Sequence, residues 1–174
     1  MGGVYYLDEI YDNEKYTRLI EYALETSDFF MFVFCKKKNE GFKRSMLEIK
    51  KKLSYLNVKA QYRYSWVGTE TIPGGNYEHQ VCFYRADVSA MQCLLSVNSL
   101  FEWIWPLLPQ DLCFFREDRC WFCSTSHERL AVITEPTHQD VEFFKQLSND
   151  AGSMYYSDTK WDAEEASLRG LRMC

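Results

Sequence analysis

Residues 29–35 form an unbroken run of seven apolar residues, and this run limits the folds open to the chain more than any other feature. Strands with an apolar side chain at every position are those covered on both faces of a sheet. A membrane span needs about 20 such residues, far more than this run contains. The run therefore predicts a central β-strand buried on both sides, and it predicts no membrane span.

Apolar periodicity predicts the remaining elements. Patterns typical of strands cover residues 58–66, 79–85, 112–116, 120–125 and 130–134. Helical spacing of apolar residues covers residues 13–26, 42–56, 87–103 and 137–147. Hairpins and two crossovers connect these elements, which disfavours a doubly wound parallel sheet. The sequence thus predicts an α+β fold, with a mostly antiparallel sheet of five or six strands and three or four helices packed on one side of it.

Length and composition fit one domain. The chain has 174 residues, of which 47% are hydrophobic, and single hydrophobic cores commonly serve chains of about 100 to 200 residues. We expect a single α+β domain over residues 1–150. A polar, acidic C-terminal extension with one short helix, at residues 162–171, is expected over residues 151–174.

The first nine residues and the cysteines predict the compartment. The opening residues contain neither the basic segment nor the apolar stretch of a secretory signal. The seven cysteines are odd in number, and most lie inside apolar runs, which is typical of buried thiols. We therefore expect a cytoplasmic protein with reduced cysteines.

Cys120 and Cys123, with Cys113 upstream and His127 downstream, have the residue types and short spacing that suit tetrahedral zinc. Side chains three apart on a regular strand point to opposite faces, so the two thiols are not expected to share an ion. A redox-active pair would need its first cysteine at a helix N-terminus, and a strand pattern continues here instead. We predict no metal site and no cofactor.

His127 is the histidine best placed for catalysis, because Ser124, Ser126 and Glu128 lie beside it. A small hydrolase or transferase using His127 with a nearby Cys or Ser is therefore one alternative function. No nucleophile motif frames these residues, and the glycine spacing of phosphate-binding loops is missing as well. We predict no catalytic residue.

Charge is distributed unevenly along the chain. Residues 36–63 hold ten basic side chains and two acidic ones, although the whole chain has a net charge of −5. Tyr62, Tyr64 and Trp66 lie in or next to this basic segment, and cations interleaved with aromatic rings suit nucleic acid. A nucleic-acid-associated module is thus a second alternative. The acidic balance and the lack of a nucleic-acid-binding motif favour a solvated helix face.

Acidic residues gather toward both ends of the chain, together with tyrosines and a tryptophan. If the two ends converge in space, they form a negative, aromatic surface that attracts a basic protein. The residues predicted to bind this partner are Tyr155, Tyr156, Trp161, Asp162, Glu164 and Glu165. We expect neither nucleic acid nor a membrane as a partner.

Two stretches carry a resemblance to known proteins. Residues 105–116 read WPLLPQDLCFFR, and residues 121–128 read WFCSTSHE. This pattern resembles one in small uncharacterised bacterial cytoplasmic proteins, some of which are similar to the immunity partners of secreted toxins. The resemblance implies an inhibitor or immunity-type protein and assigns no functional residue. With the acidic ends, it makes a non-enzymatic protein-binding domain the leading hypothesis.

Overall fold

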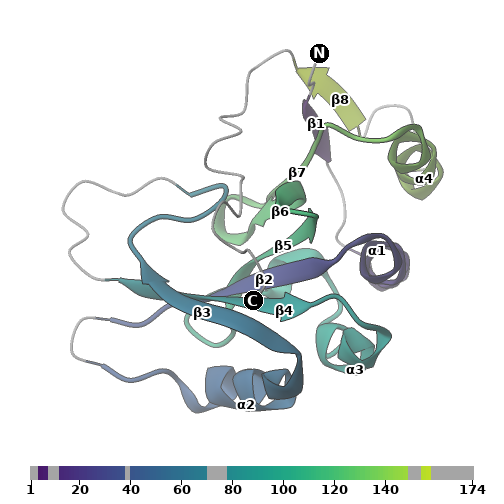
Figure 1. The fold of residues 1–174 in the computed structure, drawn as a ribbon. Coiled ribbons are helices and arrows are strands. Elements are labelled where there is room, and N and C mark those ends of the chain that lie inside the picture. Colours follow the sequence, from purple (N-terminus) through teal and green to yellow (C-terminus); the bar gives the residue numbers. More distant parts are fainter. Residues whose placement is uncertain (1–3, 8–11, 38–39, 70–77, 149–153, 158–174) are drawn as a thin grey trace.

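The structure, a computed structural model, describes residues 4–7, 12–37, 40–69, 78–148 and 154–157. Its strands form one sheet in the order β3-β4-β2-β5-β6-β7-β1-β8, and all neighbouring strands are antiparallel (Figure 1). The strands are β1 (Val4–Leu7), β2 (Phe29–Phe34), β3 (Asn57–Arg63), β4 (His79–Arg85), β5 (Gln110–Arg116), β6 (Arg119–Thr125), β7 (Leu130–Thr134) and β8 (Met154–Ser157). The α-helices are α1 (Asn13–Thr26), α2 (Arg44–Lys52), α3 (Met91–Leu94) and α4 (His138–Ser148). The predicted α+β class and antiparallel sheet are confirmed.

The six predicted strands are all present, as β2 to β7. The described sheet has eight strands, because β1 and β8 add two more at the edge beyond β7. Each of these two strands is four residues long. So short a segment shows too little alternation for a pattern to detect it.

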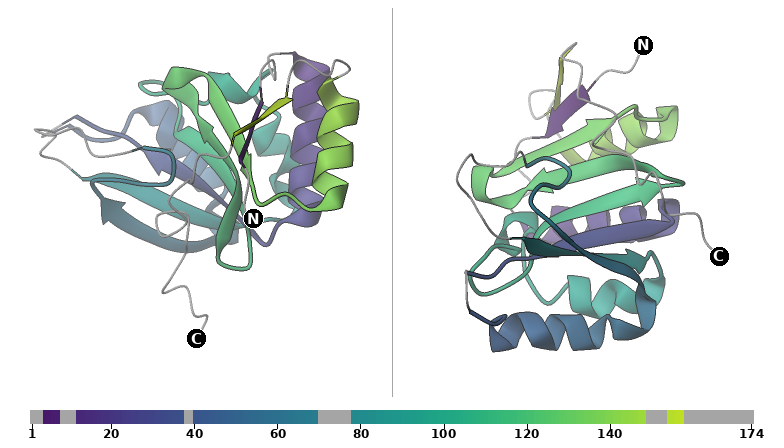
Figure 2. Two further views of the ribbon diagram at one scale, coloured as in Figure 1. Left: turned by 90° about the horizontal axis from the view of Figure 1, so that it is seen from above. Right: turned by 60° about the vertical axis from the view of Figure 1, so that its left-hand side comes forward.

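The apolar run of β2 lies inside the sheet, between β4 and β5, as predicted. Phe30 and Phe32 belong to a core cluster that also contains residues of all four α-helices, so the helices pack on this face of the sheet (Figure 2). Met31 and Val33 belong to a second cluster on the other face. All four side chains have no solvent exposure. The prediction that the helices share one side is therefore confirmed.

Among the described residues, the second cluster contains no helix residue. On that face of the sheet, Trp66 and Val67, which follow β3, pack against residues of the strands. The alternation of apolar and polar residues over 58–66 is typical of a half-buried strand, and for β3 this expectation was wrong. Tyr62 is 49% exposed and Tyr64 53% exposed, because β3 is an edge strand paired with β4 alone and its register with β4 shifts near Lys59.

The helix predicted over residues 87–103 is broken. A 3-10 turn at Val88–Ala90 leads into the short α3, and a second 3-10 turn follows at Leu100–Glu102. Between them stand Ser96, Asn98 and Ser99. Such side chains bond to the nearby backbone and compete with helical hydrogen bonds, which explains the interruption.

The predicted C-terminal extension contributes to the sheet, since β8 lies within residues 151–174 and pairs with β1. The helix predicted at residues 162–171 lies outside the described residues. No helix in the described ranges has both the length and the apolar character that a membrane crossing needs.

Candidate functional site

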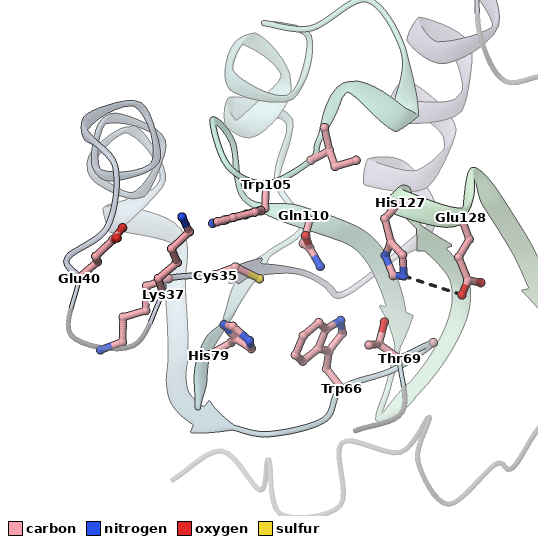
Figure 3. A pocket seen from close by; sticks show the side chains of 13 residues that line it. Cys35, Lys37, Glu40, Trp66, Thr69, His79, Trp105, Gln110, His127 and Glu128 are labelled. Atoms are coloured by element: carbon pink, nitrogen blue, oxygen red, sulfur yellow. Dashed lines mark ion pairs between the residues drawn. The ribbon is translucent and has the colours of Figure 1, made fainter. Parts of the chain in front are cut away.

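A pocket of about 850 Å³ opens at the end of the sheet where β2 finishes and β4 begins (Figure 3). Trp66, His79 and Trp105 surround it, with His127 at one end and Lys37 at the other. The further lining residues are Cys35, Lys36, Glu40, Gly68, Thr69, Ile104, Gln110 and Glu128. The volume and the mixture of aromatic walls with a few polar groups match those of small-molecule sites.

Asp111 forms hydrogen bonds to residues that line this pocket, among them Trp66, Thr69 and Gln110. Its side chain is fully buried and accepts hydrogen bonds from Trp66 Nε1 at 2.7 Å and from the Ser126 backbone N at 2.8 Å. The carboxylate thereby connects the segment after β3 to the turn that carries His127. Burial raises the pKa of Asp111, and the hydrogen bonds from Ser126 and Trp66 oppose this rise.

A β-bulge puts Asp111 in this position. Opposite β2, the register of β5 shifts between Met31 and Val33, and Asp111 has a left-handed backbone with φ of 58°. Bulges re-aim side chains and are common beside functional sites. Asp111 was not predicted from the sequence, where the available signal was an acid directly before the apolar run 112–115.

The histidines occupy different settings in the pocket. The ring of His79 stands edge-on to Trp66, 5.4 Å between centroids, and its pKa is lowered by burial and then by Lys36. His127 has a side chain that is 48% exposed, with Nε2 3.7 Å from Glu128 Oε1. His79 is thus held neutral at neutral pH, whereas His127 faces solvent.

One alternative from the sequence was catalysis by His127 with a nearby Cys or Ser. Among the described residues, no cysteine or serine side chain forms a hydrogen bond with His127. Ser124 Oγ donates to the Leu112 carbonyl, and Ser126 Oγ accepts from the Asp111 backbone N. Both serines are at most 1% exposed. Cys35 lines the pocket, but burial, and then Asp111, raises its pKa to about 12, so its thiol stays protonated.

Three thiols lie together on the sheet face opposite the helices. The Sγ atoms of Cys113, Cys120 and Cys123 are all within 4.8 Å of one another. The expectation that Cys120 and Cys123 point to opposite faces was wrong. Phe114 pairs with Phe122 and Phe115 with Cys120, so Trp121 is an extra residue in β6 and this bulge turns Cys120 to the side of Cys123.

The predicted partner-binding residues are only partly described. Tyr155 and Tyr156 lie in β8, opposite Tyr6 and Tyr5 of β1. Trp161, Asp162, Glu164 and Glu165 lie outside the described residues. The structure therefore shows that β1 and β8 pair, and the binding of a partner at these residues stays a prediction.

The basic segment 36–63 forms α2 and β3, at the opposite end of the sheet from β8 (Figure 1). Some of its cations cover aromatic rings: Lys36 Nζ lies 5.5 Å from the Tyr62 ring, and Lys50 Nζ lies 5.3 Å from the Phe42 ring. Such contacts are stabilising in themselves. They account for part of the interleaved pattern of basic and aromatic residues without nucleic acid.

Comparisons with known proteins identify no relative: no family model, no curated protein and no solved structure matches the chain. The resemblance of residues 105–128 to immunity-type proteins therefore stays a prediction.

Proposed function

We propose that the protein is a non-enzymatic protein-binding domain, an inhibitor or immunity-type partner that masks a basic surface of another protein. The observation that supports this proposal is the pairing of β1 with β8 at one edge of the sheet, because each of these strands adjoins acid-rich sequence. In the sequence, Asp8 and Glu9 follow β1 at the end where Leu7 pairs with Met154, and Asp158 follows β8 at the other end, where Ser157 pairs with Val4.

The described helices near this edge add negative charge. α4 contacts β8, and α1 packs against α4. Glu21 and Glu25 on α1 are exposed to solvent, and so is Glu142 on α4, which forms an exposed ion pair with Lys145 of the same helix. Exposed carboxylates attract a cationic protein over about 8 Å at physiological ionic strength.

The far edge of the sheet has the opposite sign. α2 and β3 carry exposed Arg44, Lys51, Lys52 and Arg63. A basic partner is attracted to the β8 edge and repelled by the β3 edge, so the charge separation orients the approach as well as accelerating it.

The protein encoded by the neighbouring reading frame is the partner to test first, because an inhibitor is usually encoded beside its target. We expect direct binding to the purified full-length chain, with an association rate that falls as salt increases. Glu164→Lys combined with Glu165→Lys should mainly lower the association rate, whereas Trp161→Ala should mainly raise the dissociation rate. Surface plasmon resonance over a salt series measures both.

The matched control is Lys51→Glu combined with Lys52→Glu on α2, which changes charge at the opposite edge. It should leave the dissociation rate unchanged and should not slow association. If the protein instead recovered chiefly RNA or DNA from its cell, and loss of Lys50, Lys51 and Lys52 abolished that recovery, the acidic-surface proposal would be wrong.

A further inference from the structure

The three-thiol cluster of Cys113, Cys120 and Cys123 has a geometry that a metal ion requires. Cys113 and Cys123 are directly opposite each other on β5 and β6, and their Sγ atoms are 3.4 Å apart. The bulge at Trp121 adds the third sulfur, so all three lie within 4.8 Å of one another. Two paired strands with a bulge are a rigid frame, so the sulfurs converge without any loop closing over them.

The surroundings of the cluster are apolar. The three cysteines are at most 2% exposed, and they belong to the same core cluster as Met31, Phe115 and Val132. Within the described residues, no histidine, aspartate, glutamate or further cysteine joins the three as a fourth donor. The site therefore offers three soft ligands and excludes water.

We propose that Cys113, Cys120 and Cys123 bind a single Cu(I) ion through their three sulfur atoms. Thiolates are soft ligands that select ions such as Cu(I) and Zn(II). Structural zinc sites have four ligands, and zinc sites with three protein ligands keep an open position for water. A dry site with three sulfurs meets neither requirement, which makes Cu(I) the better fit.

Binding releases protons. Each S–H bond that is replaced by an S–Cu bond releases one proton to the solvent, so Cu⁺ and the three cysteines give a Cu–S₃ centre and one H⁺ for every sulfur that was protonated, with no change of oxidation state. The apparent affinity should therefore rise with pH, by up to about tenfold per pH unit for every proton released.

The experiment is a Cu(I) titration of the reduced, full-length protein under anaerobic conditions against bathocuproine disulfonate, a coloured Cu(I) chelator. We expect one Cu(I) per chain, with an X-ray absorption spectrum that shows sulfur and no nitrogen or oxygen around the metal. Cys120→Ala should weaken the binding by at least about tenfold, because one of three ligands is lost.

Cys82→Ala is the matched control, since Cys82 is a fully buried thiol of β4 in the other core cluster. It should keep the affinity of the unchanged protein. If Cys120→Ala does not fold, the unchanged protein still decides the question through its stoichiometry, its sulfur-only spectrum and the rise of affinity between pH 6 and pH 8.

Three results would overturn the proposal. The first is that the chelator removes all Cu(I) when only two chelator molecules per chain are present, the number that one Cu(I) ion binds. The second is tighter binding of Zn(II) than of Cu(I) at the same three cysteines. The third is a Cys113–Cys123 disulfide in protein freshly purified without reductant, which would show that the paired thiols oxidise rather than hold a metal.

Discussion

Asp140 provides the sharpest test of how the fold is held together. Its carboxylate is fully buried and joins three elements: Arg116 of β5 donates two hydrogen bonds at 2.7 Å, Tyr22 of α1 donates one at 2.6 Å, and Thr137 donates at the start of α4. Burial opposes ionisation of Asp140, but these hydrogen bonds outweigh it and lower its pKa to about 2.

Asp140→Asn should destabilise the protein by about 3 kcal/mol at pH 7. The change leaves the Arg116 guanidinium without its charged partner, and losing one partner of a buried ion pair costs about 3 to 5 kcal/mol. The lower end applies, because the Arg116 side chain is 24% exposed and retains some hydration. Equilibrium unfolding in urea, followed by tryptophan fluorescence, measures the difference in free energy.

The effect should also depend on pH in a defined direction. The folded-state pKa of about 2 is below the ordinary value of 3.8, so this stabilisation is complete above about pH 5 and is lost as pH falls toward 2. The difference in unfolding free energy between the unchanged protein and Asp140→Asn should therefore decrease by about 1 kcal/mol from pH 5 to pH 3.

The control is Glu142→Gln on the same helix, whose ion pair with Lys145 is exposed and spans 3.4 Å. It should change stability by less than about 0.5 kcal/mol. A gap between Asp140→Asn and the unchanged protein that is below 1 kcal/mol, or that stays constant from pH 5 to pH 3, would refute the reasoning.

Two further predictions concern the pocket. Trp66→Phe should destabilise the protein by about 1 to 3 kcal/mol in urea unfolding, because it deprives the buried Asp111 carboxylate of a donor; a change as small as that of Glu142→Gln would show that this hydrogen bond contributes little. Cys35, with a pKa of about 12, should react with iodoacetamide at pH 8 about a thousandfold more slowly in the folded protein than in urea. Peptide mapping by mass spectrometry measures this rate, and equal rates in the two conditions would contradict the assigned burial and pKa.

Strands β2 to β7 were predictable because each has a local pattern of apolar residues that is typical of a strand. β2 is apolar throughout and is buried on both faces. The exposure of β3 was not predictable, since the alternation of Tyr62 with its polar neighbours Gln61 and Arg63 is typical of a half-buried strand. Its place at the edge of the sheet depends on which strands pair, and no local pattern specifies that.

Backbone irregularities account for the main errors about candidate sites. One extra residue at Trp121 reverses the face on which every later side chain of β6 lies, so the strand-phase argument about Cys120 and Cys123 failed. A second bulge turns Asp111 toward Trp66 and Ser126. The pocket itself escaped prediction because its residues come from segments far apart in the chain.

The place of β1 in the sheet imposes an order on folding. Residues 4–7 pair with residues 131–134 and 154–157, so the first strand of the sequence has no partner until β7 has been synthesised. β2 instead finds both of its partners, β4 and β5, before that point. Contacts between distant residues form slowly, because a long loop has to close before they stabilise anything. During synthesis, β2 to β6 can therefore pair before β7 is complete, whereas β1 can join the sheet only after β7 has formed.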